Sequence, residues 1–195
     1  MNEKTQDTRR RILEATRDAL LSGEGAGVRM ADIARRAGVS RQALYLHFAN
    51  RAELLVATTR FVDEELDVDA RLAASRSAAS GRERLARFIE AWGGYVPQIH
   101  PMARPLLAVY DTDTAAREAW DDRMRAVREG CAAAVAALEA DGDLAPELTA
   151  KDATDLLWGL LSVRNWEQWR FGARWSQKKY LAMVQRMAER ALIGG

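Results

Sequence analysis

Three consecutive residues, Gly38, Val39 and Ser40, separate two short apolar patterns and constrain the fold more than any other feature of the chain. Gly38 can adopt the left-handed backbone conformation that ends a helix without a Cβ clash. Ser40 can cap the following helix through its hydroxyl, and Val39 can fill the angle between two helices with an apolar side chain. The spacing therefore predicts a helix-turn-helix over residues 29–48.

The second helix of this motif has an apolar side and a polar side. Leu44 and Phe48 are its expected anchors against the first helix. Its leading and outward positions carry Arg41, Gln42, Ala43, Tyr45 and His47. Arg and Gln can pair with the edges of guanine and adenine, and a Tyr hydroxyl can donate to phosphate. The pattern favours double-stranded DNA as the partner; the alternatives are a helical corner that binds nothing and, for Tyr45, a core aromatic.

Charge is divided unevenly along the chain, although the net charge is only +1. Residues 1–60 carry a net charge of +4, and residues 61–195 carry a net charge of −3. A polyanion such as nucleic acid would be steered to the basic amino-terminal end. A merely solvated surface is the alternative explanation.

Helical periodicity runs through the sequence, and no strand-like alternation is flanked by hairpin turns, so the chain is predicted to be all-α. Apolar stripes predict helices over residues 8–21, 50–66, 114–140, 149–171 and 176–192. Residues 50–66 form the long helix that joins a three-helix amino-terminal domain, residues 1–66, to a helical domain, residues 67–195.

Two stretches are expected to interrupt the helices of the second domain. Gly93, Gly94 and Pro97 should weaken a helix towards its end, so that a separate, shorter helix carries Met102 to Tyr110. Residues 73–81 are small and Ser-rich, which predicts a flexible connection.

Residue type and spacing in the motif match a known pattern at Ile12, Leu13, Ala15, Ile33, Ala34, Ala37, Gly38, Val39, Ser40, Leu44, Tyr45, His47, Phe48, Glu53, Leu54 and Leu55. With these residues, the segment from about residue 8 to 62 resembles the tetracycline-repressor (TetR) family of transcriptional regulators. The resemblance implies a dimeric regulator, by default a repressor, that leaves a palindromic operator when it binds a small hydrophobic or aromatic effector.

The resemblance also implies roles by position. Ser40, Arg41, Gln42 and Ala43 would lead the recognition helix into the major groove, and Tyr45, His47 and Arg51 would lie against phosphates. The family commonly has Thr at the start of the first helix of the motif, whereas this chain has Arg29 followed by Met30. Arg cannot cap a helix by accepting a hydrogen bond, although its guanidinium can still bind phosphate.

For residues 67–195 the resemblance implies an effector-binding and dimerisation domain. The pocket candidates are Trp92, Tyr95, Met102, Tyr110, Trp120 and Met124, with ordinary core packing as the alternative for each. A homodimer would pair the last two helices, and its candidate interface residues are Trp158, Leu161, Asn165, Trp169, Tyr180, Met183 and Met187.

Other functional classes find less support in the sequence. The longest apolar stretch, around residues 156–163, is too short to span a membrane, and the polar start favours a cytoplasmic protein. Cys131 and two His cannot supply a recognisable zinc site, no cofactor is expected, and Cys131 is expected to be a buried apolar residue rather than a redox sensor. An enzyme is disfavoured, because no catalytic constellation is recognisable. A protein-interaction module with a basic corner is the remaining alternative.

Overall fold

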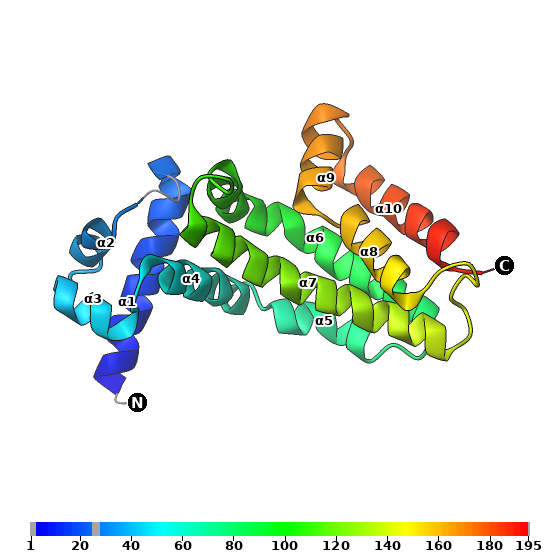
Figure 1. The fold of residues 1–195 in the computed structure, drawn as a ribbon, viewed down its shortest axis with the longest axis horizontal. Coiled ribbons are helices and arrows are strands. Elements are labelled where there is room, and N and C mark those ends of the chain that lie inside the picture. Colours follow the sequence, from blue (N-terminus) through cyan, green and yellow to red (C-terminus); the bar gives the residue numbers. More distant parts are fainter. Residues whose placement is uncertain (1–2, 25–27, 195) are drawn as a thin grey trace. The chain divides into compact units, whose positions relative to one another are not determined.

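The computed structural model describes residues 3–24 and 28–194, and these residues are helical apart from turns and an isolated bridge between Leu144 and Ile193 (Figure 1). The prediction of an all-α chain is confirmed. In chain order the elements are α1 (Glu3–Ala19), the π-helical turn η1 (Leu20–Glu24), α2 (Met30–Arg36), α3 (Arg41–His47), α4 (Arg51–Glu65), α5 (Val68–Arg76), α6 (Gly81–Ala108), α7 (Thr114–Ala140), α8 (Ala150–Leu160), α9 (Val163–Glu167), the π-helical turn η2 (Gln168–Gly172) and α10 (Gln177–Leu192).

The backbone divides into two compact units. The first consists of Met1–Leu66 with Ile99–Met124, and the second of Asp67–Gln98 with Arg125–Gly195. Helices α6 and α7 each pass through both units. This division groups residues by packing, and the functional division after residue 66 stays a prediction.

Two apolar cores are formed by described residues of the first unit. One holds the helix-turn-helix to its support, with Ile12 of α1, Leu44 of α3 and Leu54 of α4 all fully buried. The other joins α4 to the end of α6 and the start of α7 through residues such as Leu55 and Leu106. Burial of each such side chain stabilises the fold by about 1.5–3 kcal/mol, so both cores fix the position of α4.

The predicted helix starts in this region are confirmed by their caps. The Ser40 hydroxyl accepts a hydrogen bond from the Ala43 amide at 3.0 Å, and the Asn50 side chain accepts one from the Glu53 amide at 2.9 Å. Glu53 reaches back to the Ala49 amide at 2.7 Å, one residue earlier than the usual capping box. These bonds satisfy amides that a helix leaves without partners at its start.

The expected break in α6 is wrong, because the helix continues from Gly81 to Ala108 through three prolines. Pro97 has no amide hydrogen for the Gly93 carbonyl, and the side-chain amide of Gln177 on α10 donates to that carbonyl at 2.8 Å instead. Gly93 also permits the approach of α10, since a Cβ there would lie 2.6 Å from the Leu181 side chain. A side chain far along the sequence therefore supplies the hydrogen bond that Pro97 cannot make within α6.

Two further expectations are corrected. Residues 73–81 are not wholly a connection, because α5 continues to Arg76, after a left-handed Asp67 whose side chain caps the helix. The helix expected over residues 149–171 ends at Leu160, and Ser162 caps a new helix, α9, through the Asn165 amide. By contrast, α7 has the predicted bounds, and Gly142 after it has φ of +76°.

Candidate nucleic-acid interface and ligand pocket

The second helix of the helix-turn-helix, α3, presents its polar side to solvent. Gly38 has φ of +65°, so the turn before α3 needs the left-handed conformation that the sequence predicts. Arg41 and Gln42 are exposed, and Tyr45 is 52% exposed, which excludes the core alternative for that aromatic. Ser40 is exposed and Ala43 is half-buried. These side chains can reach the floor and walls of a groove together.

Leu46 is an interface candidate that the sequence reasoning missed. It lies next to Tyr45 on α3 and is 82% exposed, an unusual position for a large apolar side chain. Apolar side chains contact the methyl group of thymine in the major groove. The sequence did offer a sign of this position, because Leu46 is an apolar residue that lies outside the buried stripe of Leu44 and Phe48.

Of the two DNA-binding candidates at the start of α2, only Arg29 is exposed to solvent. Arg29 is exposed at the N-cap position and makes no side-chain capping bond within the described residues, as its chemistry predicts. Met30 is half-buried and packs against the apolar core under the motif. The Arg29 guanidinium is therefore available to a phosphate, whereas the Met30 side chain acts mainly in packing.

The end of α3 is tied to α1. Arg9 donates to the His47 carbonyl at 3.3 Å, and its guanidinium lies 4.4 Å from the centroid of the Phe48 ring. The His47 side chain is half-buried. The contact fixes the direction of α3 relative to α1.

Arg51 has partners within the chain where the resemblance implies a phosphate contact. Its Nη1 donates to both carboxylate oxygens of Asp113 at 2.8 and 2.6 Å, and its Nε donates to the Val28 carbonyl at 3.2 Å. Burial raises the pKa of Asp113, but the Ala116 amide and the Arg51 guanidinium outweigh burial and hold that pKa below its ordinary value. A phosphate would have to compete with Asp113 for this guanidinium.

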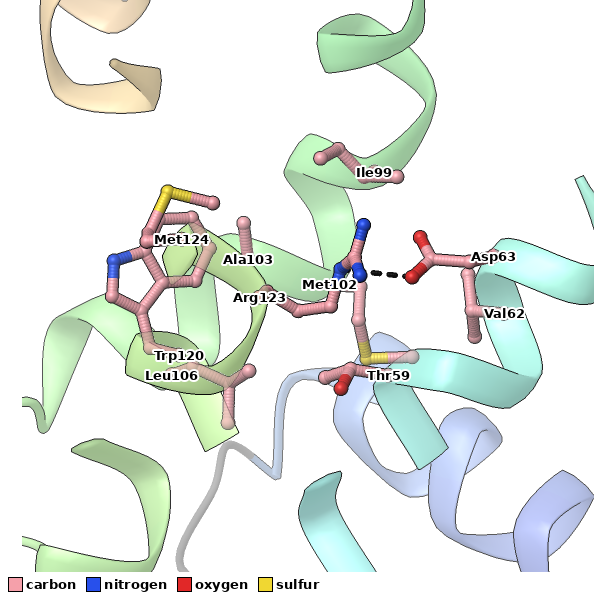
Figure 2. A pocket seen from close by; sticks show the side chains of 10 residues that line it. All are labelled: Thr59, Val62, Asp63, Ile99, Met102, Ala103, Leu106, Trp120, Arg123 and Met124. Carbon is pink, nitrogen blue, oxygen red and sulfur yellow. Dashed lines mark ion pairs between the residues drawn. The ribbon is translucent and has the colours of Figure 1, made fainter. Parts of the chain in front are cut away.

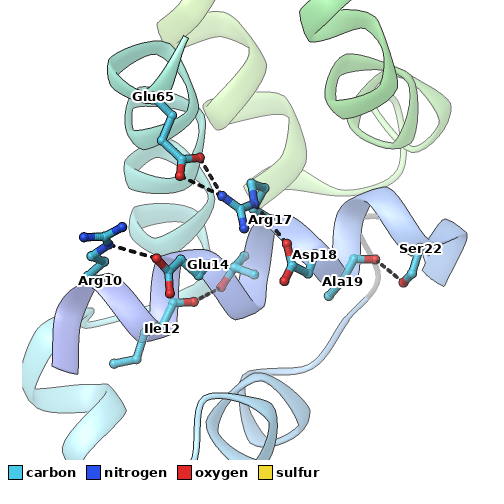
Figure 3. Close-up of polar contacts among 9 residues, drawn as sticks. Arg10, Ile12, Glu14, Arg17, Asp18, Ala19, Ser22 and Glu65 are labelled. Carbon is cyan, nitrogen blue, oxygen red and sulfur yellow. Dashed lines mark hydrogen bonds and ion pairs between the residues drawn. The ribbon is translucent and has the colours of Figure 1, made fainter. Parts of the chain in front are cut away.

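Further ion pairs attach α4 to its neighbours within the first unit. Arg60 binds Asp122 of α7 through two hydrogen bonds of 3.0 and 2.8 Å. On the α1 side, Arg17 binds both oxygens of Glu65 at 2.8 and 2.6 Å (Figure 3). Ion pairs therefore link α4 both to α7 and to α1.

A pocket lies between α4, the end of α6 and the start of α7 (Figure 2). It is lined by Thr59, Val62, Asp63, Ile99, Met102, Ala103, Leu106, Trp120, Arg123 and Met124. Met102, Trp120 and Met124 were pocket candidates from sequence, and the structure brings them together. The sequence reasoning missed Asp63 and Arg123, whose side chains form an ion pair of 2.8 Å at the pocket.

The other three pocket candidates do not line this pocket. Trp92 is buried and donates from its indole nitrogen to the Leu161 carbonyl at 2.9 Å. Tyr95 is buried beside Trp92, with ring centroids 5.9 Å apart. Tyr110 donates its hydroxyl to Asp121 at 2.8 Å on an exposed surface. Trp92 and Tyr95 are therefore buried outside this pocket, and their role in effector binding stays a prediction.

The candidate dimer residues divide by exposure. Trp158 is 37% exposed, Asn165 is exposed, and Met183 and Met187 are half-buried. Trp169 is half-buried and stacks on Trp175, with ring centroids 5.8 Å apart.

Leu161 and Tyr180 must be removed from the predicted interface. Both are 0% exposed in the single chain, so neither side chain can contact a second subunit without rearrangement. Burial also raises the pKa of Tyr180, whose hydroxyl has no hydrogen-bond partner among the described residues.

The described part of the chain has neither a metal-binding cluster nor a membrane-spanning helix. In residues 3–24 and 28–194, no group of three His, Cys, Asp or Glu side chains is arranged to hold a metal ion. Over the same residues, no helix is long and apolar enough to cross a membrane.

Comparisons with known proteins agree with this geometry. Residues 12–58 match the family described as bacterial regulatory proteins, tetR family. The chain is 42% identical over 73 residues to the HTH-type transcriptional regulator TtgR of Pseudomonas putida, covering 37% of this chain and 35% of the relative. It is 38% identical over 66 residues to the nucleoid occlusion factor SlmA of a Marinomonas species, covering 34% of each. The chain thus covers about a third of the length of these relatives.

The fold is similar to a solved structure over nearly its whole length. NalD of Pseudomonas aeruginosa, described as the secondary repressor of the MexAB-OprM multidrug efflux pump, is 25% identical, with a TM-score of 0.69 and coverage of 98% of each chain. The similarity at the amino-terminal end therefore continues into a helical body of similar fold, and within it residues 12–58 resemble the tetR family of bacterial regulatory proteins.

Proposed function

We propose that this protein is a sequence-specific DNA-binding repressor that acts as a homodimer and is released from a palindromic operator by a small hydrophobic or aromatic effector. The observation that carries the proposal is the exposed face of α3, where Arg41, Gln42 and Tyr45 stand clear of a core that fixes the helix from behind. TtgR is named as a transcriptional regulator and NalD as a repressor, which supports the same activity here. Binding to an operator would place the protein in the cytoplasm.

In this proposal, residues 1–66 bind DNA and residues 67–195 bind the effector and form the dimer. Two recognition helices related by a two-fold axis would enter successive major grooves about 34–36 Å apart. The interface residues that remain available are Trp158, Asn165, Trp169, Met183 and Met187. The solvent-exposed Trp158 and the half-buried methionines are the apolar part of this surface.

Three residues of the DNA interface carry separate roles. Arg41 reads a base, since it is exposed at the start of α3, and Tyr45 contacts phosphate. Arg29 offers a second phosphate contact from the start of α2.

Selection of bound fragments from a random duplex pool tests the proposal. We expect a palindrome with half-sites one helical turn apart, bound with an affinity that falls linearly on a logarithmic salt scale. Arg41→Ala should relax the preference at one position of each half-site, whereas Arg29→Ala should weaken all sequences about equally. Arg174→Ala, which removes an exposed arginine outside α2 and α3, is the control. Recovery of no preferred sequence would favour the protein-interaction alternative.

A further inference from the structure

We propose that the pocket between α4, α6 and α7 selects a lipophilic organic cation, such as a quaternary ammonium, by letting it replace Arg123 beside the buried carboxylate of Asp63. This inference rests on the proposed function, because it names the chemical class of the effector. Asp63 and Arg123 form an ion pair of 2.8 Å inside a pocket whose other walls are mainly apolar (Figure 2).

The two partners of this pair are not equally fixed. The Asp63 side chain is 9% exposed and short, so its charge cannot reach bulk water from α4. The Arg123 side chain is 18% exposed and long, and such side chains can bury their stem while the charged end turns to solvent. An incoming cation can therefore displace Arg123 and leave every charge compensated.

An incoming anion has no such route. It would have to bind Arg123 and draw that guanidinium away from the buried Asp63 carboxylate, and removal of one partner of a buried ion pair is strongly unfavourable. A neutral ligand would leave the ion pair in place and gain only apolar contact. Because Asp63 is fixed and Arg123 can turn away, the pocket should bind a cation more tightly than a neutral ligand or an anion.

The apolar walls suit the same class of ligand. Trp120 presents an aromatic ring, and aromatic faces attract quaternary ammonium groups. Met102 and Met124 contribute flexible thioether side chains, which can rearrange around ligands of different shape. The pocket therefore combines the Asp63 carboxylate with a polarisable apolar wall, which suits a lipophilic cation.

The pocket has to widen when it is occupied. Its present cavity of about 30 Å³ holds little more than water, which needs at least roughly 10–15 Å³ on the same measure. A phenyl or alkyl group must therefore separate α4 from the helices opposite it. Since α4 is joined to α1 by Arg17 and Glu65, widening of the pocket has a path to the helix-turn-helix.

A charge series of ligands on the unaltered protein tests the inference. The probes are (3-phenylpropyl)trimethylammonium, its neutral tert-butyl counterpart 4,4-dimethylpentylbenzene, and the carboxylate 4-phenylbutyrate, with dissociation constants measured by calorimetry or ligand-induced fluorescence change. We expect the cation to bind at least tenfold more tightly than either of the others. Equal or tighter binding of the neutral or anionic probe would overturn the inference.

Two substitutions should shift cation binding in opposite directions. Asp63→Asn should weaken it at least tenfold and leave the neutral probe unchanged, whereas Arg123→Met should strengthen it several-fold by removing the internal competitor. Asp122→Asn is the matched control, because Asp122 lies next to Arg123 on α7 but pairs with Arg60 outside the pocket. Weakening by Asp122→Asn equal to that by Asp63→Asn would also overturn the inference.

Operator binding is measured separately for every variant, together with its melting temperature. A protein that selects the cation but binds no operator would refute the proposed function and leave the ligand class standing. A protein that binds its operator but prefers a neutral or anionic probe would refute only the ligand class. Should Asp63→Asn fail to fold, the charge series and Arg123→Met still decide the question.

Discussion

The Arg51 guanidinium at the start of α4 holds the carboxylate of Asp113, which in turn accepts the Ala116 amide and caps α7. Arg51 also donates to the Val28 carbonyl, just before the helix-turn-helix. One cation therefore connects the segment just before the helix-turn-helix to the start of α7. The same cation lies where the family resemblance implies a phosphate contact, so Asp113 and DNA would compete for it.

The first prediction concerns this competition. Asp113→Asn keeps a side chain that can cap α7 but removes the charge that holds Arg51. We expect operator affinity to rise about three- to tenfold and the logarithmic salt slope to steepen by about one unit, since one more phosphate contact becomes available. Fluorescence anisotropy at several salt concentrations measures both quantities, with Asp111→Asn as the exposed control nearby. Unchanged slope and affinity would remove Arg51 from the phosphate contacts.

The contribution of the Arg51–Asp113 ion pair to stability should depend on pH. The folded pKa of Asp113 lies below its ordinary value of 3.8, so its stabilising contribution is complete above that value and is lost as pH falls through the lower, folded pKa. The stability difference between the parent and Asp113→Asn should therefore shrink below about pH 4, where the unfolded carboxyl becomes protonated. Urea unfolding at pH 7 and at pH 3 gives the comparison. A difference that is constant with pH would contradict the assignment.

Gly38 should be required for its backbone conformation rather than for space. Its φ is +65°, while the nearest atom to an added Cβ would be a flexible Arg11 nitrogen at 3.9 Å. Gly38→Ala should destabilise the fold by about 1–2 kcal/mol, the cost of a left-handed non-glycine residue, and should weaken DNA binding.

Gly142→Ala is the matched control for that substitution. Gly142 has φ of +76° with open space around it, far along the sequence from the helix-turn-helix. Gly142→Ala should lower the free energy of unfolding by a similar amount and leave operator affinity unchanged. Loss of DNA binding in both variants to the same degree would show that stability alone explains the effect.

Leu46 should affect DNA binding and not stability. Because its side chain is 82% exposed, Leu46→Ser should change the free energy of unfolding by less than about 0.5 kcal/mol. We expect a loss of preference at one position of the half-site, measured with a panel of single-base operator variants. Leu156→Ser, at a 46% exposed position of α8, is the control. An unaltered base preference would place Leu46 outside the groove.

The repair of α6 by Gln177 can be measured as a double-mutant cycle. Gln177 donates to the Gly93 carbonyl and accepts from the Trp166 indole at 3.0 Å, so Gln177→Leu should cost about 2–4 kcal/mol. Pro97→Ala supplies a backbone amide that can bond to the same carbonyl, and it should restore part of the loss only when Gln177 is absent. Additive effects would contradict the proposed link.

Cys131 should be unreactive in the folded protein. It is fully buried, and burial raises the pKa of its thiol to about 12, so the reactive thiolate is scarce at neutral pH. A thiol reagent at pH 8 should modify the protein only at the rate of unfolding, with rapid reaction in denaturant. Rapid modification of the native state would revive the redox-sensor alternative.

Much of the molecule could be predicted because its signals are local. The turn at Gly38, the caps at Ser40 and Asn50 and the bounds of α7 depend on residues within one or two helical turns, and sequence spacing records those relations directly. The same local chemistry placed Arg41, Gln42 and Tyr45 on the exposed side of α3.

Other features depend on partners that lie far apart in the sequence. Periodicity shows that Tyr180 belongs to an apolar stripe, but only packing decides whether that stripe faces the core or a second subunit. Likewise, Pro97 was expected to weaken its helix because it leaves the Gly93 carbonyl without a backbone donor. The sequence does not show that Gln177, 80 residues after Pro97, donates to that carbonyl instead.

By itself, the sequence determined an all-α chain with a helix-turn-helix and its base-reading candidates, since short-range sterics and capping specify those elements. Only the tertiary structure decided that Arg51 faces Asp113 and that Asp63 and Arg123 share a pocket. The physical reason is that charges 60 or 62 positions apart carry no mark of pairing in the sequence. Their pairing follows from how α4 and α7 pack.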